Sequence, residues 1–233
     1  MKLILQGLAP QADTVQQIAT LAGAARTTQL SDGAFLCDVA ADANAISTAL
    51  RQQIDAACHA AQLDYALLPA LLQWRNFGLL AMDMDSTLIT IECIDEIADM
   101  QGLKPQVAAI TEAAMRGEIE FNESLRRRVA LLRGLDASAL QRVYDERLRL
   151  SPGAERMIDA VKAAGLHTLL VSGGFTFFSD RVRERLALDI SHANQLEVVE
   201  GKLSGDVVGK IVNADEKKAT VERVCNQLGI TQA

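Results

Sequence analysis

Two aspartates follow an apolar run and are spaced in a way that suggests chemistry. Asp83 and Asp85 are separated by one residue in the stretch LLAMDMDST, residues 79–87. In extended backbone, residues two apart point to the same side, so we expect both carboxylates to share one pocket. Neighbouring carboxylates repel unless a cation or proton lies with them. The pair therefore predicts a site in which Asp83 and Asp85 hold Mg²⁺, one attacks as a nucleophile and the other transfers a proton. The alternative is a strand that ends in a solvated turn.

Two later features could bind an anion beside this pair. Ser172, Gly173 and Gly174 end a short apolar run, and their hydroxyl and backbone N–H groups could surround phosphate oxygens. The alternative is an ordinary helix cap with a glycine turn. Lys217 lies in the first turn of a predicted helix, where cations are unfavourable, which indicates an anionic partner unless it is a surface lysine. Lys218 is its adjacent competitor and ranks lower.

The elements that must position these residues alternate between strand and helix from residue 77 onward. This order predicts an α/β fold with a parallel, Rossmann-like sheet, in which ligands bind beyond the carboxyl ends of the strands. Residues 92–149 are helical in pattern and would form a cap inserted over that edge, with Asp95 and Glu96 on the exposed side of a helix start.

Residues 1–76 read as βαββαβ, a small ferredoxin-like α+β domain. Asp42 is the expected N-cap of its second helix. The predicted domains are therefore 1–76 and 77–233.

The composition of the chain argues against several classes of partner. The 233 residues carry a formal net charge of −7, which argues against nucleic acid as a partner. We expect no membrane span, because no segment approaches roughly 18 uninterrupted apolar residues, and no signal peptide. Four scattered cysteines, outside any metal-ligand spacing, indicate reduced thiols in a cytoplasmic protein.

Taken together, the three motifs resemble the haloacid dehalogenase-like phosphohydrolases. Residues 79–87 match that family's hhhhDxDx[TS] motif, Ser172 its strand-terminal Ser or Thr, and Lys217 its lysine. The resemblance implies the family's α/β fold and Mg²⁺-dependent hydrolysis of a phosphomonoester, in which Asp83 forms an aspartyl-phosphate and Asp85 is the acid–base. The phosphate would be bound by Ser172, Gly173 and Lys217.

Two longer stretches, DMDSTLITIECIDEIA and GEIEFNESLRRRVALLRG, resemble the members of this family that act on O-phospho-L-serine in L-serine biosynthesis. The resemblance implies that Glu92 meets the substrate's ammonium group and Arg128 its carboxylate. Phe121 would close over the substrate, and Met115 would pack near it. The first domain resembles the ACT-type modules that bind amino acids, often as dimers, which implies a possible homodimer through the N-terminal domain.

The chain departs from the family pattern in one respect. An acidic GDGxxD-type fourth motif, which completes the family's Mg²⁺ site, is missing; Asp206 and Asp215 are the nearest downstream acids, and neither follows a predicted buried strand. We therefore expect either that the chain is a truncated form of a longer enzyme or that another chain supplies the missing motif. The alternative function is a catalytically impaired form that acts as an amino-acid-binding or regulatory protein. A phosphatase for another phosphomonoester is disfavoured, since it would leave the charges of Glu92 and Arg128 unpaired.

Overall fold

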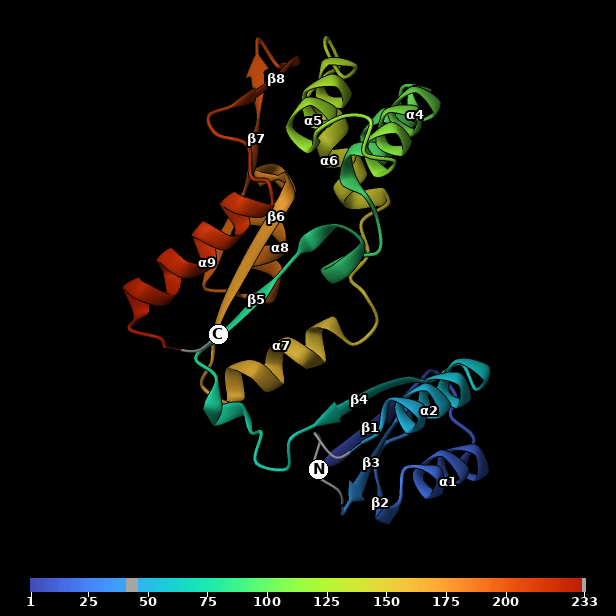
Figure 1. The fold of residues 1–233 in the computed structure, drawn as a ribbon. Coiled ribbons are helices and arrows are strands. Elements are labelled where there is room, and N and C mark those ends of the chain that lie inside the picture. The colour runs from blue at the N-terminus through green and yellow to red at the C-terminus, as the bar shows by residue number, and fades with distance from the viewer. Residues whose placement is uncertain (41–45, 232–233) are drawn as a thin grey trace. The chain divides into compact units, whose positions relative to one another are not determined.

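The chain folds as two compact units, each with its own hydrophobic core (Figure 1). The computed structural model describes residues 1–40 and 46–231. Unit 1 is Met1–Gln73 and unit 2 is Trp74–Ala233. The division between the units falls between Gln73 and Trp74, whereas the sequence predicts domains of residues 1–76 and 77–233.

Unit 1 is a four-stranded antiparallel sheet with two helices. Its sheet order is β2-β3-β1-β4, so the first strand lies centrally and pairs with β3 and β4. Leu3 and Leu5 of that strand point to the buried side, two residues apart, and pack with residues of both helices such as Ile18 and Ile54. The observed order is βαββαβ, as predicted: β1 (Lys2–Gln6), α1 (Ala12–Leu21), β2 (Ala24–Ser31), β3 (Ala34–Val39), α2 (Thr48–Ala60) and β4 (Asp64–Leu68).

The second helix of unit 1 begins later than the sequence predicts. Asp42, the expected N-cap, lies outside the described residues. Helix α2 begins at Thr48, and Ser47 caps it by accepting a hydrogen bond from Leu50 N at 3.1 Å. A serine in this place satisfies one of the amide groups that a helix start leaves without a partner.

Unit 2 contains the predicted parallel sheet, in the order β5-β6-β7-β8. The first three strands run parallel, and β8 returns antiparallel to β7 as a hairpin. The elements are β5 (Leu79–Met82), a π-helical turn η3 (Met84–Leu88), α3 (Cys93–Asp99), α4 (Lys104–Met115), α5 (Phe121–Ala130), α6 (Ser138–Glu146), α7 (Ala154–Ala163), β6 (His167–Phe175), α8 (Thr176–Leu186), β7 (Ile190–Val199), β8 (Lys202–Val208) and α9 (Ala214–Leu228), preceded by the 3₁₀ turn η2 (Trp74–Asn76).

Helices cover both faces of the parallel strands. Leu169 of β6 packs on one face with Val224 of α9. Its neighbour Leu170 packs on the other face with Ile158 of α7 and Phe178 of α8. Because both faces are buried, β6 reads as a continuous apolar run rather than an alternating one.

Helices α3 to α6 form an insertion between β5 and α7. They share buried side chains such as Ile97 and Val143. Arg147 joins two of them, because its Nη1 donates to Glu96 and to Asp99, each at 2.5 Å. The expectation that Glu96 is merely solvated is therefore wrong: it pairs with Arg147 and with Lys104.

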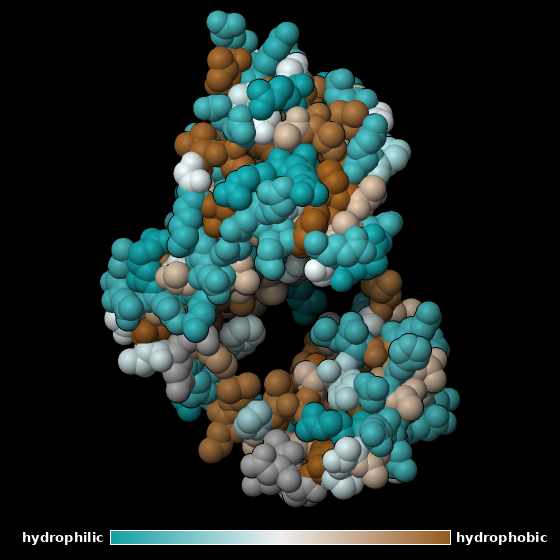
Figure 2. Space-filling model, turned by 45° about the horizontal axis from the view of Figure 1, so that its top comes forward, coloured by the Kyte–Doolittle hydropathy of each residue, from teal (hydrophilic) through white to brown (hydrophobic). Residues whose placement is uncertain are grey.

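The exterior is mostly polar. Hydrophilic side chains predominate on the face of unit 2 in Figure 2, with hydrophobic ones scattered among them. None of the helices in the described ranges is both long and apolar enough to cross a bilayer.

Candidate active site

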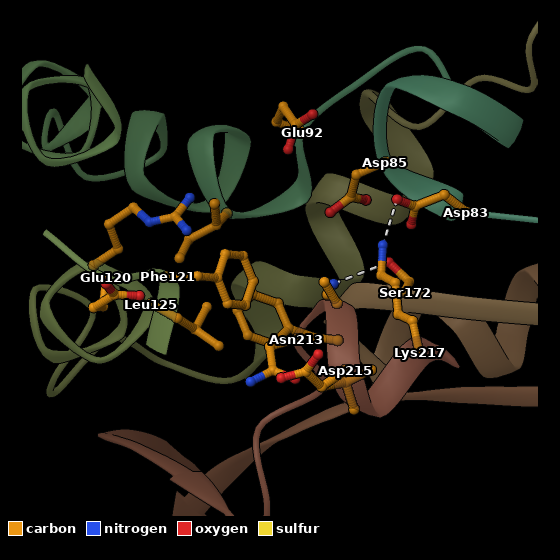
Figure 3. A pocket seen from close by; sticks show the side chains of 17 residues that line it. Asp83, Asp85, Glu92, Glu120, Phe121, Leu125, Ser172, Asn213, Asp215 and Lys217 are labelled. Atoms are coloured by element: carbon orange, nitrogen blue, oxygen red, sulfur yellow. Dashed lines mark hydrogen bonds and ion pairs between the residues drawn. The ribbon is translucent and has the colours of Figure 1, made fainter. Parts of the chain in front are cut away.

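A cavity of about 510 Å³ lies at the carboxyl ends of β5 and β6, between the sheet and the insertion (Figure 3). Parallel sheets commonly bind ligands at this edge. The lining residues are Asp83, Asp85, Glu92, Ile94, Glu120, Phe121, Leu125, Arg128, Ser172, Gly173, Gly174, Phe175, Val212, Asn213, Ala214, Asp215 and Lys217.

Asp83 lies directly beyond the end of β5. Its Oδ1 accepts a hydrogen bond from Met84 N at 2.8 Å, which caps the turn η3. Its Oδ2 accepts from Lys217 Nζ at 2.5 Å, across 134 positions of sequence. The strand ends at Met82, but Asp83 (φ −80°, ψ 165°) and Asp85 (φ −62°, ψ 133°) both keep extended backbone angles, in agreement with the expectation for these two positions. Ser86 has a φ of 51° and turns the chain back, and both carboxylates still line the cavity.

Asp85 is in an environment that favours a proton. Burial raises its pKa from an ordinary 3.8 to about 7; a hydrogen bond from Cys93 lowers it, while the charges of Glu92 and Asp83 raise it further. Its Oδ1 is shielded from solvent and has no hydrogen-bond partner among the described residues. A buried oxygen in this state calls for a proton or a cation.

The Ser172–Gly174 segment, near the end of β6, faces these aspartates. Ser172 is 1% exposed, and its Oγ accepts from Gly174 N at 2.9 Å, which leaves its hydroxyl hydrogen available to a ligand. A Cβ on Gly174 would lie 2.7 Å from Asp85 Oδ2, so only glycine allows this close approach. Gly173 faces the insertion, where a Cβ would lie 3.2 Å from Phe121 Cζ.

Lys217 reaches the cavity from the first turn of α9. Asn213 caps this helix by accepting from Glu216 N at 3.0 Å. The ammonium group of Lys217 then lies against Asp83 (Figure 3). Lys218 points away, is 77% exposed and pairs with Glu222. The structure thus brings together Lys217, and not its neighbour, with the paired aspartates.

The insertion side of the cavity carries charges of both signs. Glu92 accepts a hydrogen bond from Ser86 Oγ at 2.6 Å. Arg128 on α5 is partly buried, and this burial lowers its pKa against the opposing effects of the Asp95, Glu92 and Asp85 charges. Among the described residues, its guanidinium group donates one hydrogen bond, a long one of 3.4 Å from Nε to Ser124 O. Most of its guanidinium N–H groups therefore remain for a ligand.

One predicted site residue does not reach the cavity. Met115, at the end of α4, is 84% exposed and lies outside the lining. In turn, the sequence interpretation missed Glu120 and Asn213, both of which line the cavity. Asn213 had a readable signal, because an Asn directly before a helical run is a typical N-cap. Asp215 also lines it, although it follows no buried strand.

The donor set suits a hard cation with few protein ligands. The described residues contain no group of three or more His, Cys, Asp or Glu side chains arranged for a metal ion. Mg²⁺, however, commonly takes only one or two carboxylates and completes its shell with waters and substrate phosphate. The two aspartates and the unpartnered Asp85 Oδ1 fit that requirement.

A family model described as haloacid dehalogenase-like hydrolase matches residues 80–232, well over half of the chain. The chain belongs to this family. Among similar haloacid dehalogenase-like proteins, one named phosphoserine phosphatase from Polaromonas sp. is 54% identical over 165 residues, which are 69% of this chain and 70% of that protein. A second protein named phosphoserine phosphatase, from Albidiferax ferrireducens, is 52% identical over 164 residues, which are 68% of this chain and 69% of that protein.

Solved structures of the family agree with this fold. A haloacid dehalogenase family hydrolase from Salmonella enterica serovar Typhi has a TM-score of 0.84 at 31% identity, over 99% of this chain and 79% of that one. A probable phosphoserine phosphatase from Vibrio cholerae has a TM-score of 0.78 at 31% identity, over 98% of this chain and 69% of that one.

Proposed function

We propose that the chain hydrolyses O-phospho-L-serine to L-serine and inorganic phosphate, as a phosphoric monoester hydrolase of the haloacid dehalogenase-like family. One observation carries this proposal. A single cavity has a carboxylate nucleophile held by a lysine at one end, and an acid and a guanidinium at the other. The names of the relatives at 52–54% identity support it.

The proposed chemistry begins with Asp83. Its carboxylate attacks phosphorus, a new bond to an Asp83 oxygen forms, and the bond to the serine oxygen breaks. Asp85, whose pKa is raised to about 7, gives its proton to that leaving oxygen. Asp85 then takes a proton from a water that attacks phosphorus. The bond between phosphorus and the Asp83 oxygen breaks, inorganic phosphate leaves, and the Asp83 carboxylate is restored.

The phosphate end of the cavity neutralises the charge that accumulates in these steps. Lys217 approaches Asp83 closely enough for one ammonium group to serve both the nucleophile and a phosphoryl oxygen. The Ser172 hydroxyl and the Gly173 amide would donate to the remaining oxygens, while the Gly174 amide is engaged by Ser172 Oγ. Mg²⁺, held by Asp83 and Asp85, would supply further charge neutralisation when bound.

The other end selects an amino acid. Glu92 would pair with the substrate ammonium group, and Arg128 would grip its carboxylate with two parallel N–H donors. Both side chains line the cavity, and the unused donors of Arg128 leave room for this contact. Phe121 would cover the substrate, and helices α3 to α6 would act as a cap that excludes water. A direct substrate contact by Met115 is not part of this proposal, because that side chain is exposed.

The finer biological setting is also proposed. An activity of this kind fits the last step of L-serine biosynthesis in the cytoplasm. Unit 1 has the element order and sheet order of a ferredoxin-like domain, which supports an ACT-type, amino-acid-binding role and a homodimer through this domain. Light scattering of the purified chain, with and without L-serine, tests the dimer: a monomer under both conditions contradicts it.

Release of phosphate tests the function. The purified chain with Mg²⁺ should release phosphate from O-phospho-L-serine, and Asp83→Asn should abolish the release. Arg128→Lys keeps the charge but loses the paired donors, so KM for O-phospho-L-serine should rise on the order of tenfold or more. O-phosphoethanolamine, which has no carboxylate, is the matched substrate, and its KM should barely respond. Activity that survives Asp83→Asn would contradict the mechanism.

The comparisons do not favour the alternative of a non-catalytic, regulatory protein. Relatives at 43–54% identity carry the name of the enzyme. The chain covers about 70% of two of them and 49% of a third, from Archaeoglobus fulgidus.

A further inference from the structure

The ladder between β6 and β7 is interrupted at the edge that forms the cavity. Val171 pairs with His192, and the next pair is Phe175 with Asn194. Residues 172–174 of β6 therefore stand opposite the single residue Ala193 of β7. The surplus residues bulge out of the strand, and Ser172, Gly173 and Gly174 line the cavity. A bulge of this kind leaves backbone polar groups without ladder partners.

One buried side chain bonds to the bulge and also to the segment that precedes α9. Asn194 is 1% exposed, and its Nδ2 donates to Gly173 O at 2.8 Å. Its Oδ1 accepts from Val212 N, also at 2.8 Å. The amide orientation follows from chemistry, because a flipped amide would place an oxygen against a carbonyl and an NH₂ group against an N–H.

These two bonds end on two backbone segments that carry proposed phosphate-binding groups. Gly173 belongs to the bulge that presents Ser172. Val212 directly precedes Asn213, which caps the helix that carries Lys217. Asn194 itself is not among the residues that line the cavity. It is therefore placed to control the spacing of the two segments without touching a ligand.

We propose that Asn194 is a positioning residue that sets the distance between the Ser172–Gly173 bulge and the start of α9, and thereby the affinity of the cavity for a phosphoryl group. The inference rests on the proposed function in that it assigns the phosphate to this end of the cavity. It makes the site depend on a residue of β7 as well as on residues at the ends of β5 and β6. Misplacing either segment would spoil the simultaneous contact of the hydroxyl and the lysine with one phosphate.

Asn194→Leu tests this role, because leucine has a similar size and makes neither hydrogen bond. The matched control is Thr168→Val at the opposite end of β6. Thr168 is fully buried, and its Oγ1 likewise donates to Asp189 Oδ2 at 3.0 Å and accepts from Asp189 N at 2.9 Å. Both variants lose two hydrogen bonds made by a buried side chain, but only one loses them beside the cavity. Asn194→Ser, which is smaller and can admit a water, is the second test variant.

The readout is the affinity for inorganic phosphate with Mg²⁺ present, measured by calorimetry on samples whose cooperative unfolding shows that they are folded. We expect Asn194→Leu and Asn194→Ser to weaken phosphate binding at least tenfold, and Thr168→Val to stay within twofold of the wild type. The affinity for L-serine should be retained in all three, because Glu92 and Arg128 lie on other elements. A general loss of structure would weaken both ligands together.

Several results would overturn the proposal: a folded Asn194 variant that binds phosphate as well as the wild type, an equal loss in Thr168→Val, or a wild type that does not bind phosphate. Failure of both Asn194 variants to fold would assign the residue a purely structural role instead. Hydrolysis of O-phospho-L-serine by the wild type is measured separately. Its absence counts against the proposed function, while phosphate binding alone decides the role of Asn194.

Discussion

Replacing Asp85 with asparagine should stabilise the metal-free protein at neutral and alkaline pH. The folded state raises the pKa of Asp85 from 3.8 to about 7, chiefly through burial. A raised pKa in the folded state means that the carboxyl stabilises the fold when it is protonated. This contribution is complete below pH 3.8 and is lost as the pH rises through about 7. Asparagine stays neutral and keeps it at every pH.

The size of the effect follows from the same pKa. A tenfold change in proton affinity corresponds to about 1.4 kcal/mol, so the raised pKa sets an upper limit of about 4 kcal/mol. Asp85 is only half-buried, and solvent screening reduces this figure. We therefore expect Asp85→Asn to exceed the wild type by about 2 kcal/mol in free energy of unfolding at pH 8, and to differ little near pH 4.

Urea unfolding in EDTA, at intervals from pH 4 to pH 8, measures this difference. Asp159→Asn, at an exposed position on α7, is the matched control for the removal of one carboxylate. A difference between Asp85→Asn and the wild type that is flat across this range would refute the electrostatic reasoning. Adding Mg²⁺ should then stabilise the wild type more than Asp85→Asn, because a ligand stabilises the form that binds it.

Four further variants, one of them a control, test separate parts of unit 2. Lys217→Met should lower kcat for phosphate release by about 10²-fold or more, whereas Lys218→Met should leave it unchanged; equal effects would contradict the geometry. Gly174→Ala should lower kcat by about 10–100-fold with little change in KM, because its Cβ would displace Asp85. Arg147→Ala should lower the urea concentration at the midpoint of unfolding, and no change would show that its two ion pairs add nothing.

The sequence predicts the architecture well where hydrophobic periodicity decides it. The βαββαβ order of unit 1 and the alternating strands and helices of unit 2 follow from runs whose burial agrees with their spacing. The boundary of α2 was less accessible. Two polar residues, Asp42 and Ser47, could both serve as caps, and local preference alone does not choose between them.

The site depends on features with a weaker sequence signal. The chain turns directly after Asp85, where Ser86 takes a positive φ, which nothing in a serine indicates. Asn194 sits on a strand, where a polar residue is read by default as solvent-facing; its burial follows from a bulge in a different strand. Met115 shows the converse, since a resemblance carries a residue's identity but not the packing of the helix that bears it.

The contact between Asp83 and Lys217 has a consequence for the order of events during synthesis. The two residues lie 134 positions apart in the sequence, so their ion pair closes a very long loop. A ribosome that adds about 5–20 residues per second needs on the order of ten seconds to make the intervening chain. During that interval unit 1, which has its own hydrophobic core, can already fold, while the carboxylates of the cavity still lack the lysine of α9. Catalytic competence is therefore a late event, and its appearance reports the docking of the last helix rather than the collapse of the chain.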